Sequence, residues 1–176
     1  MREFLFVVGI ILGLAIQSDV RAQSTAMRRG DVLLNIAPSI TNLGPGISIN
    51  LESVAHYKST FGVKTGCLYH SDAYRSQSFE YAIPYAALQY NYHLAHLFGR
   101  DRRMDYYAGL SAGYSYWHPL FDEQETVDTD YFIEDSRLIV HVQAGMRFFF
   151  KRKSALWIEL SAGSWISANA GITFAF

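Results

Sequence analysis

Residues 138–150 read LIVHVQAGMRFFF, and every second position of this stretch is apolar. The even positions from Leu138 to Phe150 carry no polar side chain, whereas the odd positions include His141, Gln143 and Arg147. Successive side chains of a β-strand point to opposite faces of the sheet, so this period of two predicts a strand with one apolar and one polar face.

The same alternation recurs along the rest of the chain and predicts eight strands. Beyond residue 103 it is found in residues 105–116, 156–162 and 166–176, and before that point, less regularly, in 32–37, 47–57, 61–70 and 79–94. Pro84 interrupts the last of these segments. Because proline lacks a backbone donor, we expect a bulge or a local loss of strand pairing there.

The composition excludes several kinds of protein. The chain has 176 residues and a formal charge of −1, which gives no electrostatic reason to expect a nucleic-acid partner. A single cysteine, Cys67, excludes an internal disulfide framework and a cysteine-rich zinc site. Charged residues make up 18% of the chain, below the roughly 25% of soluble domains, so the surface is expected to be poor in charge.

We expect the strands to form an all-β, eight-stranded, antiparallel, up-and-down transmembrane β-barrel. Strands of about 9 to 14 residues are long for a soluble sandwich, and a sheet in lipid must close because lipid offers no partners to a free edge. The face with glycine and small polar residues would then line a narrow lumen. The alternative, a soluble lipocalin-like barrel, would turn the apolar face inward and would need more surface charge than this chain carries.

The N-terminus predicts export. Arg2 precedes an apolar run from Phe4 to Ile16, and small residues precede an expected cleavage after Ala22. This run is too short for a hydrocarbon core of roughly 30 Å, which favours a cleaved signal peptide over a membrane anchor. We therefore expect a signal peptide (1–22), a short periplasmic N-terminal segment (23–29) and an outer-membrane barrel (30–176) in a Gram-negative-type cell.

Connection lengths predict the orientation of the barrel. Turns near residue 58, in 96–103 and in 151–154 alternate with connections at 41–45, 71–78, 117–135 and 163–165. Outer-membrane barrels have short periplasmic turns and longer extracellular loops, so the termini and the first group should be periplasmic. Aromatic residues are expected at both membrane interfaces. They are Tyr57, Phe61, Tyr92, Tyr106, Phe148, Phe174 and Phe176 at the periplasmic end, and Tyr69, Tyr81, Tyr116 and Trp117 at the other.

Four segments resemble a known family. Residues 83–92 (IPYAALQYNY), 106–115 (YYAGLSAGYS) and 144–150 (AGMRFFF) resemble the outer-membrane β-barrel domain family of small, opacity-porin-like barrels. The ending 170–176 (AGITFAF), with Phe174 and Phe176 at its third-last and last places, is similar to the C-terminal signal read by the barrel-assembly machinery. The resemblance implies a porin-like fold, an outer-membrane location and that machinery as a partner. It implies no single activity, because the family shares architecture rather than chemistry.

The polar face carries charged residues that we expect to pair inside the lumen. Folding each periplasmic hairpin about the centre of its turn places opposite charges face to face, about 5 Å apart at Cβ. The expected pairs are Glu52 with Lys64, His93 with Asp105, and Arg147 with Glu159. Unpaired burial of charge is costly, so we interpret the pairs as a structural filling of the lumen. A proton or ion path is the alternative.

The sequence offers little for catalysis or cofactor binding. Lipid A deacylases of similar size typically place a histidine two residues before the catalytic serine, and no His-x-Ser occurs here. Ser111 and His141 could approach each other on neighbouring strands, but no carboxylate is assured beside them. We find no phosphate-binding loop and no metal-ligand spacing, and therefore expect no cofactor, no metal and no enzymatic activity.

The connection 117–135 is acidic, and the expected periplasmic turns are basic. It contains Asp122, Glu123, Glu125, Asp128, Asp130, Glu134 and Asp135, with no Lys or Arg. The turns instead contain Arg100, Arg102, Arg103, Lys151, Arg152 and Lys153. The acidic loop could be simply solvated, could bridge divalent cations to lipopolysaccharide phosphates, or could bind calcium weakly. Its apolar residues, which include Trp117, Tyr131 and Phe132, indicate a loop that folds over the barrel mouth or meets a partner.

These observations favour a structural or interaction role. The barrel would present residues 117–135 to a protein partner or to lipopolysaccharide, within outer-membrane lipids. The alternatives are a lipid-modifying outer-membrane enzyme and a narrow pore for ions or small solutes.

Overall fold

The computed structural model describes residues 27–56, 58–74, 77–94, 103–120, 135–151 and 153–176. The predicted signal peptide (1–22) and most of the predicted N-terminal segment (23–29) lie outside these ranges. The described residues form eight strands. They are β1 (Val32–Thr41), β2 (Pro45–His56), β3 (Ser59–Tyr74), β4 (Gln77–His93), β5 (Met104–Pro119), β6 (Asp135–Lys151), β7 (Ser154–Gly163) and β8 (Ser167–Ala175).

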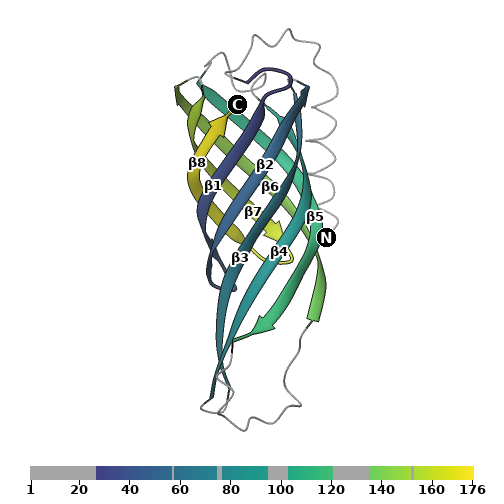
Figure 1. Cartoon of the computed structure of the whole chain (residues 1–176), viewed down its shortest axis with the longest axis vertical. Coiled ribbons are helices and arrows are strands. Elements are labelled where there is room, and N and C mark those ends of the chain that lie inside the picture. The colour runs from purple at the N-terminus through teal and green to yellow at the C-terminus, as the bar shows by residue number, and fades with distance from the viewer. Residues whose placement is uncertain (1–26, 57, 75–76, 95–102, 121–134, 152) are drawn as a thin grey trace, which may run out of the picture.

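The strands close into one antiparallel up-and-down barrel, as predicted (Figure 1). Each strand pairs with the next along the chain, and β1 pairs with β8 to close the sheet. In the closing seam Leu34 faces Phe174 and Asn35 faces Thr173. Closure leaves no free sheet edge, which is the condition for strands in lipid.

The wall of the barrel is taller on one side than on the other. Strands β3 to β6 have 16 or 17 residues, whereas β1, β2, β7 and β8 have 9 to 12. In Figure 1 these long strands extend beyond the short ones at the lower end. Two predicted connections are therefore shorter than expected: β3 and β4 run through most of residues 71–78, and β5 continues to Pro119. Alternation alone missed these extensions because it weakens near the strand ends.

The two ends of the barrel differ in what they contain. We call the end with Met27 and Phe176 the terminal end; the β2–β3, β4–β5 and β6–β7 connections lie there. The other end, which holds the β5–β6 connection, is called the loop end. At that end a tight turn joins β1 to β2, where Thr41 Oγ1 accepts hydrogen bonds from the backbone N–H groups of Leu43 and Gly44. Gly44 has a φ of 143°, which a residue with a Cβ rarely adopts.

Pro84 changes pairing on one side only. Toward β3 the register is continuous, with Cys67 opposite Pro84. Toward β5 the pairs Ala82 with His118 and Tyr85 with Ser115 keep the same register, and the ladder is interrupted between them. The interruption is therefore a local loss of pairing and not a bulge, because no extra residue is inserted.

The described residues include no helix of the length and apolarity needed to cross a membrane.

Candidate functional site

Alternate side chains point into the lumen, as the period of two predicted. On β7, for example, Ala155, Trp157, Glu159 and Ser161 are buried, and the residues between them are exposed. All six residues of the predicted charge pairs lie in the lumen. Glu52, Asp105, Arg147 and Glu159 have an exposed fraction of 0%.

The partners of these charges differ from the prediction in two of three cases. His93 and Asp105 form the predicted pair, with 2.7 Å between Nδ1 and Oδ1. The predicted pairs Glu52 with Lys64 and Arg147 with Glu159 are wrong. Lys64 pairs with Glu159 across the barrel, and Arg147 pairs with Glu52 and Asp105.

The cause is the register of the hairpins. Glu52 lies opposite Gly62 and not Lys64, and Arg147 lies opposite Trp157 and not Glu159. Irregularities between Val54 and His56 and between Phe149 and Lys151 shift each ladder by one residue, and each turn is centred slightly before the assumed position, since His56 pairs with Ser59 and Lys151 with Ser154. A symmetric fold about the turn centre does not include such a shift. The β4–β5 ladder is also offset, with His93 opposite Tyr107, but the His93 and Asp105 side chains still meet.

A first group of charges lies toward the terminal end, and we call it the ion cluster (Glu52, His93, Asp105 and Arg147). The guanidinium of Arg147 donates to Glu52 and, over 3.1 Å, to Asp105 Oδ2. Three neutral donors complete the shell of Glu52. They are Asn35 Nδ2 at 2.7 Å, Thr60 Oγ1 at 2.7 Å and Asn91 Nδ2 at 3.0 Å. Each buried carboxylate of this cluster therefore has a cationic or ring partner, which offsets its desolvation.

A second group lies in the middle of the lumen, and we call it the central cluster (Lys64, Tyr107, Trp157 and Glu159). Lys64 Nζ is 2.6 Å from Glu159 Oε1, and the Tyr107 hydroxyl donates to Glu159 Oε2 over 2.7 Å. That hydroxyl accepts from Trp157 Nε1 over 2.6 Å. The Arg147 guanidinium lies 4.5 Å from the centroid of the Tyr107 ring, so Tyr107 links the two clusters. Gly145 lies opposite Tyr107 in the ladder. Only glycine fits at this position, because a Cβ at residue 145 would collide with the Tyr107 ring.

Apolar layers lie beyond the clusters at both ends. At the terminal end Met27 packs with Leu33, Val54 and Phe149, so the N-terminal segment contributes to the filling. Toward the loop end Leu68, Ile83, Ile139 and Trp165 form the corresponding layer. The sequence had placed Trp165 in a turn and gave no sign that its ring enters the lumen, 4.5 Å from the His141 ring.

The mouth at the loop end carries rings that the sequence had placed at the membrane interface. Tyr81 and Trp117 are partly buried against the apolar layer, with 5.9 Å between their ring centroids. His70 lies beside both, and the Arg137 guanidinium is 4.8 Å from the Trp117 ring centroid. Tyr81 and Trp117 thus face the mouth and not the outer wall.

Elsewhere in the lumen, several buried polar atoms have no hydrogen-bond partner among the described residues, and Arg147 Nε of the ion cluster also has none. We call this group the polar layer. Its members are Asn50, Gln89, Ser111, Gln143 and Asn169. Ser111 lies opposite His141 in the ladder, as the sequence suggested. His141 Nε2 accepts a weak hydrogen bond from the Trp165 backbone N–H at 3.3 Å, and Ser111 Oγ is one of the unpartnered atoms.

Most of the acidic loop lies outside the part of the chain that the structure describes. Residues 121–134, which include Asp122, Glu123, Glu125, Asp128, Asp130, Tyr131, Phe132 and Glu134, lie outside the described residues, as does the side chain of Asp135. Within the described part of the chain, no three side chains of His, Cys, Asp or Glu come together as metal ligands.

Apolar side chains predominate on the outer wall of the barrel. Exposed residues such as Leu88, Leu110, Leu138 and Leu160 occupy it. Among the side chains that the structure describes, Glu80 near the loop end is the one carboxylate on this wall, and it contacts the Tyr69 hydroxyl. Aromatic residues of the terminal end face outward as predicted, with Phe61, Phe148, Phe174 and Phe176 exposed. Tyr57 lies outside the described residues.

The chain matches no protein-family model, and no curated protein sequence matches it. Solved structures share its fold at low sequence identity. The outer membrane protein OprG from Pseudomonas aeruginosa is 8% identical with a TM-score of 0.67, over 90% of this chain and 99% of that one.

Two further structures are similar. The N-terminal β-barrel domain of Pseudomonas aeruginosa OprF is 13% identical with a TM-score of 0.56, over 84% of this chain and 98% of that one. Ail of Yersinia pestis, in complex with the heparin analogue sucrose octasulfate, is 11% identical with a TM-score of 0.54, over 85% of this chain and 100% of that one. The chain therefore has the small, closed barrel fold found in outer-membrane proteins.

Proposed function

We propose that the protein is an outer-membrane barrel of a Gram-negative-type cell with a structural or interaction role. The observation that carries this proposal is the contrast between an apolar outer wall and a lumen filled with ion pairs. Water-soluble barrels have the reverse arrangement, whereas transmembrane barrels place apolar residues against lipid. The terminal end would be periplasmic and the loop end extracellular, following the rule of short turns and long loops.

The filling of the lumen favours a structural role over transport. Apolar layers lie at both ends of the lumen, and the ion and central clusters occupy the space between them. A barrel of eight strands is just wide enough for side chains to fill it. Solute passage would require several buried contacts to break together.

The interaction role would reside in the acidic loop, residues 117–135. Rings at the mouth, including Trp117 and Tyr81, would support the base of this loop. Ail was solved with a sulfated ligand, but this loop contains no Lys or Arg. We therefore propose a partner with cationic groups or bridging divalent cations, such as a basic protein surface or cation-loaded lipopolysaccharide.

Assembly would use the C-terminal strand. Phe174 and Phe176 face outward from the last strand, where a partner could reach them. We propose that the barrel-assembly machinery reads this pair.

Cross-linking from the loop in intact cells tests the interaction role. A photoreactive residue replaces Tyr131 or Phe132, and the matched control carries it at Leu110 on the outer wall. We expect the loop positions to capture a defined partner that the control position does not capture. The same products from all three positions would refute the role, and heat-modifiable gel mobility shows that each variant has folded.

A narrow pore is the second candidate, and the polar layer is the observation that favours it. Unpartnered atoms of Gln89, Ser111 and Gln143 could solvate a passing solute. Planar-bilayer recording separates the two candidates. We expect no stable conductance from the folded protein, and stable conductance would favour the pore.

We do not propose enzymatic activity. Ser111 and His141 are adjacent, but they lie inside the lumen, and the apolar layer that includes Trp165 lies between them and the loop-end mouth. This layer would hinder a lipid substrate from reaching Ser111. An unchanged lipid A mass upon expression is the expected result, and a mass shift would contradict it.

A further inference from the structure

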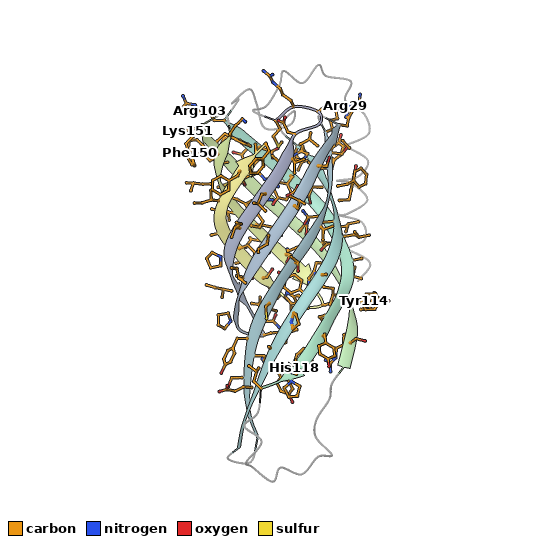
Figure 2. All side chains as sticks on the ribbon, in the orientation of Figure 1. Arg29, Arg103, Tyr114, His118, Phe150 and Lys151 are labelled. Atoms are coloured by element: carbon orange, nitrogen blue, oxygen red, sulfur yellow. The ribbon has the colours of Figure 1, made fainter. Side chains whose placement is uncertain are left out.

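A set of basic side chains surrounds the terminal end of the barrel, and we call it the basic rim. Its members are Arg28, Arg29, Arg103, Lys151 and Lys153, all exposed. Figure 2 shows Arg29, Arg103 and Lys151 at the same end of the molecule, far from His118. Among the described residues of this end, the acidic side chains are Asp31, which caps the backbone N–H of Arg28, and Glu52 and Asp105, which are buried in the lumen.

Backbone pairing distributes the rim around the barrel. The Arg103 carbonyl accepts from the Phe149 N–H, which places Arg103 between β5 and β6. The Lys153 carbonyl accepts from the Ala175 N–H, which places Lys153 beside the end of β8. The segment with Arg28 and Arg29 lies beside the end of β2, since the Gly30 N–H donates to Val54. The cations therefore form an arc and not a single patch.

The basic rim lies closer to the terminal end than a group of exposed aromatic side chains on the outer wall, and next to them in the chain. Phe150 precedes Lys151 in the chain and is 51% exposed, and Phe148, Phe174 and Phe176 are exposed nearby. Aromatic residues of membrane proteins mark the boundary between hydrocarbon and headgroups. A cation one step beyond that boundary is at the depth of lipid phosphates.

We propose that the basic rim binds the headgroups of anionic phospholipids in the leaflet at the terminal end. The proposal rests on the membrane placement proposed above and adds the lipid class and the residues that select it. Basic residues at a membrane surface attract anionic lipids because the lipid carries net negative charge and a zwitterionic lipid does not. An acidic protein surface at the same rim is the competing occupant.

Tryptophan quenching by brominated lipids tests the proposal. The reporter is Phe150→Trp, next to Lys151, and the signal is the difference from the parent protein. The full chain is folded into phosphatidylcholine vesicles that contain phosphatidylglycerol, with one lipid or the other brominated. We expect phosphatidylglycerol to be enriched about twofold to fivefold at the reporter, and the enrichment to decrease with salt.

Substitutions in the basic rim test whether its charges cause the enrichment of phosphatidylglycerol. Lys151→Gln with Lys153→Gln should abolish most of the enrichment, whereas Lys151→Arg with Lys153→Arg should retain it. A second reporter, Tyr114→Trp, is the spatial control, because Tyr114 is 64% exposed on the wall far from the rim (Figure 2). We expect equal quenching by the two lipids at this position.

The outcomes separate the two proposals. If the protein inserts, as heat-modifiable mobility shows, but the two lipids quench the Phe150→Trp reporter equally, the lipid-binding rim is refuted and an acidic protein becomes the better occupant. Enrichment that persists in the Gln variant also refutes it. If the protein does not insert into either vesicle, the membrane placement itself fails.

Discussion

The ion cluster and the polar layer occupy the same lumen, yet their polar groups are satisfied to different degrees. In the ion cluster Glu52 accepts from four side chains, and its charge is balanced by Arg147. In the polar layer Ser111 and both amide atoms of Gln89 have no partner in the described structure. The cost of a substitution in this lumen should therefore depend on which polar groups lose their partners, and not on burial alone.

The largest effect is expected for Arg147→Met. This change leaves Glu52 and Asp105 buried without their shared cation, which should reduce the free energy of unfolding by roughly 3–5 kcal/mol. Urea unfolding in lipid vesicles measures the loss. In double-mutant cycles, Arg147 should couple more strongly to Glu52 than to Glu159. Equal coupling energies would contradict the observed pairing.

Lys64→Met should cost less, about 2 kcal/mol, because Glu159 keeps the Tyr107 hydroxyl as a donor and the Asn169 amide at 3.4 Å. Adding Glu159→Gln removes the stranded charge and should recover part of the loss. The same unfolding assay serves, and a double variant less stable than Lys64→Met alone would argue against the pair.

Thr60→Val tests a neutral partner of the ion cluster. The Thr60 hydroxyl donates to Glu52 over 2.7 Å, and its removal should cost about 1–2 kcal/mol while volume is conserved. Folded protein is first verified by heat-modifiable mobility. A cost near zero would mean that this hydrogen bond contributes little to Glu52.

The smallest effect is expected for Ser111→Ala in the polar layer. No hydrogen bond of the described structure is lost, so the free energy of unfolding should change by less than about 0.5 kcal/mol. Thr60→Val is the matched hydroxyl deletion. If Ser111→Ala costs as much as Thr60→Val, the contrast between the two layers disappears.

Most of the fold could be predicted from the sequence. The alternation around residues 138–150 predicts the direction of each side chain, and burial of His141, Gln143 and Arg147 confirms it. Strand number, closure, and the inward position of every predicted charge follow from the same pattern. The signal peptide and most of the acidic loop remain predictions.

The alternation in the sequence predicts the face on which most residues lie, because side-chain direction follows the period of the strand. Tyr81 and Trp117 are exceptions, since both turn into the mouth of the barrel. Which charges form pairs depends on the register and the closure of the barrel. The position of the turn and the Val54/His56 irregularity together place Glu52 opposite Gly62 and not Lys64, and the alternation of side chains carries no information about either. Lys64 on β3 and Glu159 on β7 belong to strands that never pair, and they meet because closure of the barrel brings opposite walls within side-chain reach.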